Sequence, residues 1–183
     1  QLLSAGDIVM CGSNGSKKLV GKAAMLQVTP KARTSFGAFC LGIRCKSTLV
    51  PEYLATFFQT SLYREKIEAL GSGSNILNIK PDHIYDLEVS IPSYDEQKAF
   101  VSIVKQADKS KFVGFKSQFI EMQRCSNRSN TLGDFIARCT PDRCGNRGDL
   151  PTLSVTKERA IVFQDERFDA CVASKDKSNY IIA

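Results

Sequence analysis

The sequence predicts an α+β fold, in which two β-rich parts with mixed or antiparallel strands are joined by a long helix. Short apolar runs bounded by Gly, Asn and Ser clusters recur in the first and last thirds of the chain, as is typical of strands and turns. Between them, residues 93–125 repeat apolar side chains at steps of three and four, which indicates a helix. With 183 residues, 43% of them hydrophobic, the chain can bury a core in one or two domains.

Residues 1–92 form the first predicted part. Its apolar runs are separated by loops rich in Gly, Ser and Asn. The predicted strands are 8–11, 23–28, 36–46 and 87–91. A helix is predicted from Pro51 to about residue 70, because proline suits the first helical turn and the apolar side chains that follow have the helical period.

The central helix is predicted over residues 93–125. Ser93 and Glu96 form a Ser-x-x-Glu capping box at its start, and acidic side chains in the first turn suit the helix dipole. About thirty residues at ~1.5 Å each give roughly 45 Å of helix, which needs a partner helix along its length. We expect subunit-interface contacts from its apolar stripe, which has a weak point at Gly114. The stripe comprises Phe100, Val104, Ala107, Phe112, Phe115, Phe119 and Met122.

Residues 126–183 form the last predicted part, after a polar hinge at 126–130. The predicted strands are 132–136, 151–155, 161–163 and 180–182, with a loop over 140–150. Because this short part ends in a strand, we expect an incomplete domain. The first residue of the chain is glutamine, which further indicates a fragment or a processed product.

The net charge of +6 and the pI near 9.0 are compatible with a polyanionic partner. The excess is spread along the chain, and many globular proteins share it, so charge alone does not establish nucleic-acid binding. No apolar run approaches the ~20 residues of a membrane span, and the N-terminus lacks the features of a signal peptide. We therefore expect a cytoplasmic protein that does not associate with a membrane.

The cysteines and the single histidine limit the possible chemistry. Seven cysteines are an odd number, and no pair has the two-residue gap of a zinc knuckle. We therefore predict reduced thiols and no metal site, with a small metal protein or enzyme that uses Cys139 and Cys144 as an alternative. With His83 as the only histidine and no cofactor fingerprint, we predict a non-catalytic protein without a cofactor.

The loop after the first strand, residues 12–18, offers small polar groups followed by Lys17 and Lys18. It is not a P-loop, because neither Gly-Lys-Ser/Thr nor a helix follows at the required spacing. Its glycines would allow the backbone to approach a ligand closely, and its lysines could contact phosphates. An ordinary solvated hairpin loop is an equally open interpretation.

Short motifs along the chain resemble those of the DNA sequence-specificity subunit of type I restriction-modification systems. No single motif decides the resemblance, but their order and spacing are fairly specific and cover nearly the whole chain. In order, the motifs are Gly6-Asp7-Ile8, Val20-Gly21-Lys22-Ala23, Pro51-Glu52-Tyr53-Leu54, Gly71-Ser72-Gly73-Ser74-Asn75, Ile91-Pro92, Leu132-Gly133-Asp134, Leu153-Ser154-Val155-Thr156-Lys157 and Ala173-Ser174-Lys175-Asp176-Lys177-Ser178-Asn179-Tyr180.

The resemblance implies two target recognition domains, each of which reads one half of a bipartite, gapped site in double-stranded DNA. It makes residues 1–92 the C-terminal part of the first domain, 93–125 a spacer that pairs as an antiparallel coiled coil, and 126–183 the N-terminal part of the second. A methyltransferase subunit, which would hold S-adenosylmethionine, and a restriction subunit are the implied partners. A ~45 Å spacer would hold the two readers roughly 13 base pairs apart at ~3.4 Å per pair.

Candidate DNA-binding side chains lie in the first loop, in the second loop that follows the predicted helix of the first part, and in the last third. Lysines among them would mostly contact phosphates, whereas Asn and Ser could read base edges. They are Ser13, Asn14, Ser16, Lys17, Lys18, Ser72, Ser74, Asn75, Lys157, Ser174, Lys175, Ser178 and Asn179.

Two other hypotheses concern assembly. In one, the chain is a helical assembly module that reads no DNA itself. In the other, two copies associate head to tail, because the C-terminal NYIIA followed by the N-terminal QLLSAGDIV would read as continuous recognition-domain sequence.

Overall fold

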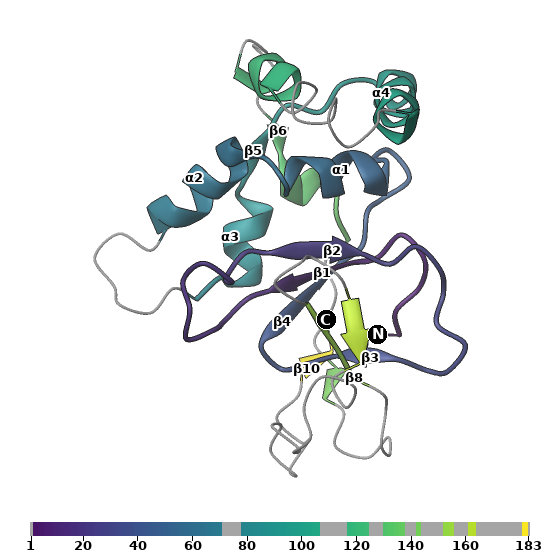
Figure 1. Ribbon diagram of the computed structural model, residues 1–183, viewed down its shortest axis with the longest axis vertical. Coiled ribbons are helices and arrows are strands. Elements are labelled where there is room, and N and C mark those ends of the chain that lie inside the picture. Colours follow the sequence, from purple (N-terminus) through teal and green to yellow (C-terminus); the bar gives the residue numbers. More distant parts are fainter. Residues whose placement is uncertain are drawn as a thin grey trace.

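Strand β1 (Ile8–Cys11) is the middle strand of a three-stranded antiparallel sheet, between β2 (Ala23–Met25) and β4 (Cys40–Ile43). The computed structural model describes residues 2–70, 78–106, 117–124 and 130–137, and from the rest only the course of four short strands. The helices lie over one face of the sheet, above it in Figure 1.

The first two predicted strands are confirmed, although the second ends at Met25. The predicted strand over 36–46 consists of two strands, β3 (Ser35–Phe36) and β4. A turn separates them, in which the backbone N–H of Cys40 donates to the carbonyl of Gly37 at 2.9 Å. The apolar composition predicts extended structure here, but the glycine allows the chain to turn.

The side chains of β1 are divided between two cores, because alternate residues of a strand point to opposite faces. Ile8 and Met10 belong to the larger core, beneath the helices. Val9 points to the other face, into the smaller core. The smaller core comprises Leu3, Val9, Leu26 and Phe36.

Two helices, α1 (Pro51–Phe57) and α2 (Ser61–Leu70), cover the larger core where the sequence predicts one continuous helix. Thr60 separates them. Its hydroxyl donates to the carbonyl of Phe57 at 2.7 Å and accepts the backbone N–H of Tyr63 at 3.2 Å. Thr60 therefore caps the start of α2 with its side-chain oxygen, and the chain changes direction there.

Residues 130–137 pack with the first part of the chain. β6 (Asn130–Thr131) pairs antiparallel with β5 (Glu88–Val89), which lies within the predicted strand 87–91. Leu132 and Ile136 are buried in the larger core. These residues belong to the last predicted part, 126–183, but the side chains of Leu132 and Ile136 complete the core of the first part.

The predicted strand over 132–136 is wrong. Residues Leu132–Asp134 form a turn of 3-10 helix, η1, which packs against α3 (Pro81–Tyr85). A side chain at Gly133 would place its Cβ 3.1 Å from the backbone oxygen of Tyr85, so glycine allows η1 to approach α3 closely without displacing that backbone. The apolar residues Leu132 and Ile136, which suggested a strand, are instead both buried in the larger core, one within η1 and the other just after it.

The predicted single helix over 93–125 is also wrong as a straight rod. Helix α4 (Tyr94–Gln106) and residues 117–124 are helical, but the rings of Phe100 and Phe119 lie 4.8 Å apart between centroids. One straight helix would separate these residues by about 28 Å. Both rings contact Tyr53 of α1 edge to face, at 5.6 and 5.2 Å, so aromatic packing holds the two helical segments against the larger core.

The predicted start of this helix is confirmed. The carboxylate of Glu96 accepts the backbone N–H of Ser93 at 2.9 Å, and the hydroxyl of Ser93 accepts the N–H of Glu96 at 3.4 Å. This is the reciprocal pattern of a capping box.

Buried polar side chains in the described residues all have hydrogen-bond partners. Gln97 of α4 is fully buried, and its Oε1 accepts the backbone N–H of Val50 at 2.8 Å. Its Nε2 donates to the carbonyls of Thr48 and Pro92 at 3.1 and 2.9 Å. One amide side chain thus joins the start of α4 to the start of α1.

A partly buried ion pair fixes the N-terminal segment. The Arg44 guanidinium donates to both carboxylate oxygens of Asp7, at 2.7 and 2.6 Å, and to the carbonyl of Leu2 at 2.9 Å. The Asp7 carboxylate also accepts the backbone N–H of Ser4 at 2.7 Å. This bidentate geometry ties the segment before β1 to the residue that follows β4.

Four short strands of the last part have defined pairings. β8 (Thr152–Val155) pairs in parallel with β3 and antiparallel with β9 (Ile161–Phe163). β10 (Ile181–Ile182) pairs antiparallel with β7 (Asp142–Arg143). Predicted strands therefore occur at β8, β9 and β10, whereas the predicted loop 140–150 contains β7. Helices with small, mostly antiparallel sheets are compatible with the predicted α+β class.

Among the helices that the structure describes, none combines the length and the apolar character that a membrane crossing requires.

Candidate nucleic-acid interface

The first predicted DNA-binding loop connects β1 to β2. Asn14, Ser16, Lys17 and Lys18 are exposed, and Ser13 is half-buried. The side-chain oxygen of Asn14 accepts the backbone N–H of Ser16 at 2.9 Å, which closes a local turn. The loop therefore presents polar and cationic side chains on a backbone with its own internal support.

The start of this loop lies beside the residues that follow the second predicted loop. Ser13 forms an antiparallel bridge with Asn78, and the N–H of Ile79 donates to the carbonyl of Gly12 at 2.8 Å. The second-loop candidates Ser72, Ser74 and Asn75 lie outside the described residues. The bridge places the start of the first loop next to Asn78.

Arg64 of α2 supports the middle of the first loop. Its guanidinium donates to the carbonyls of Val20 and Lys17, at 2.7 and 3.0 Å, and its Nε donates to Glu68 at 2.7 Å. The positive charge of Arg64 is thus directed at loop carbonyls and one carboxylate. Arg64 was not predicted as a site residue, because an arginine within a helix has the pattern of a solvated face.

The end of the loop is fixed by Tyr63 and Gly21. The Tyr63 hydroxyl donates to the carbonyl of Gly21 at 2.8 Å. Burial raises the pKa of Tyr63, so the hydroxyl keeps the proton that it donates. Gly21 has φ +82°, and a Cβ there would lie 3.0 Å from Cγ2 of Ile67, so the position requires glycine.

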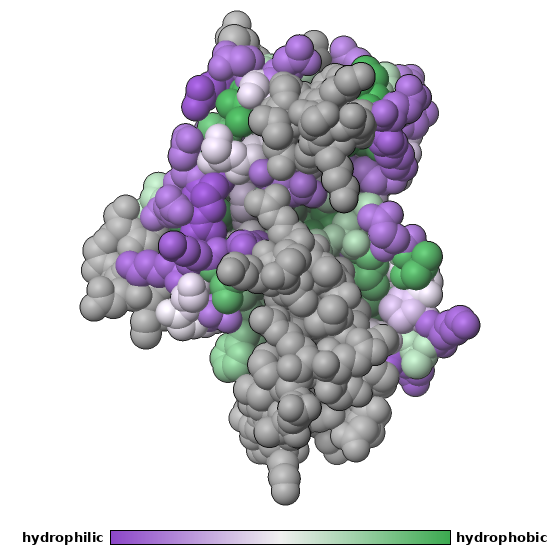
Figure 2. All heavy atoms as spheres, in the orientation of Figure 1, coloured by the Kyte–Doolittle hydropathy of each residue, from purple (hydrophilic) through white to green (hydrophobic). Residues whose placement is uncertain are grey.

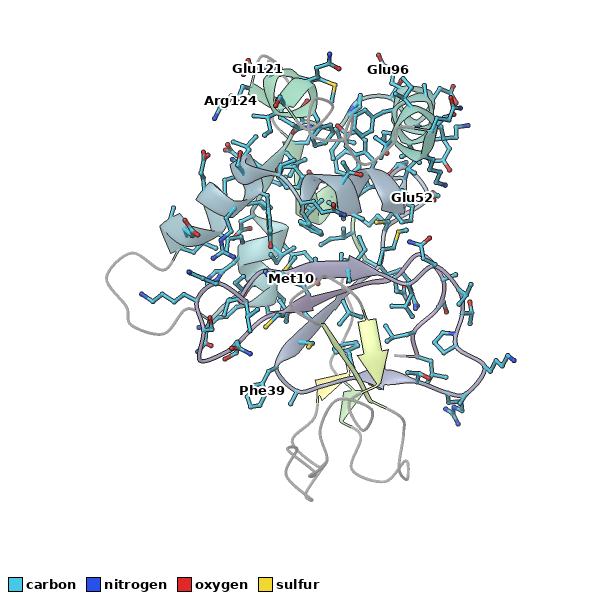
Figure 3. The ribbon with its side chains drawn as sticks, in the orientation of Figure 1. Met10, Phe39, Glu52, Glu96, Glu121 and Arg124 are labelled. Atoms are coloured by element: carbon cyan, nitrogen blue, oxygen red, sulfur yellow. The ribbon has the colours of Figure 1, made fainter. Side chains whose placement is uncertain are left out.

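Phe39 adds an apolar group at the end of β1 from which the first loop begins. Its carbonyl accepts the backbone N–H groups of Gly12 and Ser13, at 2.8 and 3.0 Å. Its side chain is 71% exposed and points away from the sheet in Figure 3. Exposed aromatic rings stack on bases in proteins that bind single-stranded nucleic acid. Phe39 lies within the predicted strand 36–46 and was not predicted as a site residue.

The charge of residues 12–22 is uniform in sign. This segment contains Lys17, Lys18 and Lys22 and no acidic residue. Together with the supports from α2, it forms an exposed cationic loop of defined shape. We call residues 12–22 the anchored loop.

The remaining DNA-binding candidates lie outside the described residues. They are Lys157, Ser174, Lys175, Ser178 and Asn179. Of the predicted set, the structure therefore brings together only the five of the first loop.

The predicted subunit-interface stripe is partly directed inward. Phe119 is buried in the larger core, and Phe100 and Val104 are half-buried. Met122 is exposed, whereas Ala107, Phe112 and Phe115 lie outside the described residues. An inward Phe119 is a correction to the prediction, because this ring packs on Tyr53 within the same chain.

A groove of about 500 Å³ runs between the start of α1 and α4. Its lining residues are Val50, Pro51, Glu52, Tyr94, Lys98, Val101, Ser102, Lys105 and Gln106. Lys105 donates to Glu52 at 2.9 Å within this groove, and that hydrogen bond holds the Glu52 pKa below its ordinary value. Figure 2 shows a largely hydrophilic surface over α4.

The described residues offer little for metal binding or acid–base chemistry. No group of three or more His, Cys, Asp or Glu side chains is placed there to hold a metal ion, while Cys139 and Cys144 lie outside the described residues. Burial and the nearby carboxylates of Asp7 and Glu52 raise the pKa of Cys45 to about 12, so this thiol stays protonated at neutral pH.

Two curated proteins are similar to the chain. One is the specificity subunit of the type I restriction enzyme StySPI from Salmonella potsdam, which is 40% identical over 115 residues. The other is the specificity subunit of the type I restriction enzyme EcoKI from Escherichia coli (strain K12), which is 38% identical over 115 residues. Each alignment covers 61% of this chain and 24% of the relative, so the chain spans about a quarter of the length of the relatives it matches.

No family model and no solved structure matches the chain. The resemblance that the short motifs predict is confirmed by the two relatives. Over 61% of its length, the chain is similar to the specificity subunits of type I restriction enzymes.

Proposed function

We propose that the chain is a non-catalytic part of a DNA sequence-specificity subunit of a type I restriction-modification enzyme, and that it contacts DNA through the anchored loop. The relatives, named as specificity subunits, support the class of function. The observation that carries the proposed contact is the exposure of Lys17 and Lys18 on a loop that contains no acid and is supported at its start, middle and end.

The supports favour binding for an entropic reason. A loop that is ordered before binding loses less conformational freedom when it meets a ligand. Lys17 and Lys18 would contact phosphates, which position the protein on the duplex, while Asn14 and Ser16 would approach base edges. The exposed ring of Phe39 would add apolar contact, such as with a thymine methyl group.

The test compares two double variants that each remove two positive charges. Lys17→Ala with Lys18→Ala changes the anchored loop. Lys31→Ala with Arg33→Ala is the matched control, because these exposed residues lie between β2 and β3, at the opposite end of β2. Fluorescence anisotropy with a labelled duplex pool of random sequence measures affinity as a function of salt concentration.

We expect the loop variant to bind more weakly at every salt concentration and to lower the slope of log K against log salt by about two units. The control should keep the slope of the unsubstituted protein. Equal slopes for the loop variant and the unsubstituted protein would remove Lys17 and Lys18 from the DNA contact. Equal effects of both variants would show attraction by net charge alone.

The bipartite site is proposed from the resemblance of the short motifs and not from the estimated length of the spacer. Because residues 93–125 do not form one straight helix, the estimate of a gap of 13 base pairs no longer has a structural basis. We propose that residues 1–92 and the C-terminal residues belong to two recognition domains that are linked through residues 93–125. Because residues 130–137 pack in the larger core, we propose that the second recognition domain begins after Ala137. Methylome sequencing of a host that carries the gene should reveal a gapped methylated motif; a continuous motif would contradict this.

We also propose that the groove along α4 docks a methyltransferase subunit. The complex would also include a restriction subunit and act in the cytoplasm. The relatives are named as subunits, which supports an assembly, and the groove exposes Tyr94. Tyr94→Ala should weaken co-purification with the methyltransferase subunit, and unchanged co-purification would exclude this site. If Tyr94→Ala abolishes assembly while no duplex binds the chain, the alternative of an assembly module that reads no DNA gains support.

Head-to-tail self-association stays a proposal. Within one chain β8 already pairs with β3, so the last part can supply a strand to the first. Exchange of the same strand between two copies would give a dimer. A monomer in light scattering together with a single cooperative thermal unfolding transition would refute it.

A further inference from the structure

Cys11 and Cys40 occupy directly opposed positions on neighbouring strands. Cys11 ends β1, Cys40 begins β4, and the two are Cα partners in the antiparallel register. Opposed residues in an antiparallel pair point to the same face of the sheet. Both cysteines therefore lie on the face of the smaller core, against which Cys40 packs.

The hydrogen bonds of β1 show which kind of pair this is. The N–H of Cys11 donates to the carbonyl of Lys22, and the carbonyl of Cys11 accepts the N–H of Gly21, both at 2.8 Å. Both backbone groups of Cys11 thus face the β2 side. In the ladder with β4, Cys11 and Cys40 form a non-hydrogen-bonded pair.

This kind of pair brings the side chains closest together. Its Cα atoms are typically about 4.5 Å apart, at the near end of the roughly 4.4–6.8 Å range that disulfides span. The next pair toward the loop is hydrogen-bonded, with the N–H of Gly12 donating to the carbonyl of Phe39 at 2.8 Å. The backbone on the loop side of the cysteines is thereby held at a fixed separation.

We propose that Cys11 and Cys40 form a reversible cross-strand disulfide, with a small-molecule disulfide as the oxidant. Both residues are thiols in the structure, and the proposal does not depend on DNA binding. The bond would join the start of the anchored loop to the turn that carries Phe39.

The reaction is a thiol–disulfide exchange in two steps. Cys40, the more exposed of the two, attacks as a thiolate on one sulfur of the small disulfide, whose S–S bond breaks and releases one small thiol. Cys11 then attacks the sulfur of Cys40 and releases the second small thiol. Two protein thiols are oxidised, the small disulfide is reduced to two thiols, and the protons of the protein thiols pass to them.

The order of the two steps follows from burial. Cys11 is 9% exposed, and its Sγ–H donates to the carbonyl of Ser13 at 3.6 Å. Burial raises the pKa of Cys11, which makes it a poor first nucleophile. It is better suited to the second step, in which the sulfur that it attacks is already adjacent.

Cys45 provides a matched control. It follows β4, bridges to Ile136 and packs against the larger core, on the opposite face of the sheet from Cys40. Strand geometry therefore separates the Cys45 side chain from Cys11 and Cys40.

The test oxidises the folded chain with oxidised glutathione, blocks the remaining thiols with N-ethylmaleimide, and digests with trypsin without reduction. Cleavage after Lys17, Arg33 and Arg44 places Cys11 in peptide 1–17, Cys40 in peptide 34–44 and Cys45 in neither. Mass spectrometry should find peptides 1–17 and 34–44 joined, with the loss of two hydrogens, and separated again by dithiothreitol.

Three comparisons decide the result. Cys45→Ser should keep the joined peptide, and Cys40→Ser should lose it. The same oxidation in concentrated guanidinium chloride should reduce the joined peptide to its statistical share among the seven cysteines. Glutathione bound to Cys40 while Cys11 stays a thiol, or a bond from Cys11 to any other cysteine in the folded chain, would overturn the proposal.

Discussion

The two faces of the central sheet are closed in different ways. Beneath the helices, Ile8 and Met10 are fully buried by side chains from segments far apart in sequence, including Phe119 and Ile136. On the opposite face, Val9 contacts a smaller set of side chains. Consecutive residues of one strand thus depend on very different parts of the chain. The larger core is the product of long-range packing, and we expect it to dominate stability.

The faces also differ in how polar groups are satisfied. On the helix-covered face, the neutral amide of Gln97 forms hydrogen bonds with three backbone groups. On the opposite face, the charged side chains of Asp7 and Arg44 form an ion pair. A buried neutral amide needs every partner in place, whereas the Arg44 side chain, 38% exposed, is still partly solvated.

The largest expected effect compares a leucine in each core. Leu54→Ala removes a fully buried side chain of the larger core and should lower the free energy of unfolding by about 3–5 kcal/mol. Leu26→Ala in the smaller core should cost about 2–3 kcal/mol, because fewer neighbours surround it. Urea unfolding followed by circular dichroism measures both. Equal losses would mean that the two cores contribute alike.

An intermediate effect tests the polar bridge. Gln97→Leu leaves the N–H of Val50 and the carbonyl of Thr48 without their buried partner and should cost about 2–3 kcal/mol in unfolding free energy. Gln106→Leu, at an exposed position of the same helix, is the control and should change stability by less than about 0.5 kcal/mol. If the two substitutions cost the same, Gln97 does not join α4 to α1 as described.

The smallest effect concerns pH and the groove. Because Lys105 lowers the folded-state pKa of Glu52, this carboxylate stabilises the fold fully above its ordinary pKa of 4.5, and the contribution is lost as the pH falls below it. Lys105→Met should cost about 0.5 kcal/mol at pH 7, as for a solvent-screened pair, and the cost should vanish in acid.

NMR titration of the Glu52 carboxyl group provides the direct measurement. Lys105→Met should raise its pKa toward 4.5, while Lys98→Met, which removes another charge from α4, should leave the Glu52 titration unchanged. A rise in the pKa of Glu52 in both variants would indicate a general effect of charge on α4 and not the hydrogen bond from Lys105.

Local sequence patterns predicted where helices and strands occur better than where they end. The strand at Ile8–Cys11 and the capping box at Ser93 follow from neighbouring residues alone, and both are confirmed. The single helix over 93–125 failed because apolar residues at helical spacing also suit two segments that fold onto one core. Tyr53 decides between these arrangements, and its ring contacts are not visible in the sequence.

The candidate site was predicted in the same uneven way. Lys17 and Lys18 were found because a polar loop with adjacent cations is a local signal. Arg64 and Tyr63 were missed, because they act on backbone carbonyls of a loop that lies more than forty positions away in sequence. Phe39 was missed because exposure depends on the turn between β3 and β4.

By itself, the sequence determined strands β1, β2, β8, β9 and β10, the starts of α1 and α4, the cationic loop and the likeness to restriction-enzyme specificity subunits, since each depends on residues close together in the chain. Only the tertiary structure decided that Phe100 and Phe119 meet, that 130–137 complete the larger core, and that Cys11 faces Cys40. The physical reason is that burial of apolar surface is non-directional, so a local pattern specifies which side chains become buried but not which distant partners bury them.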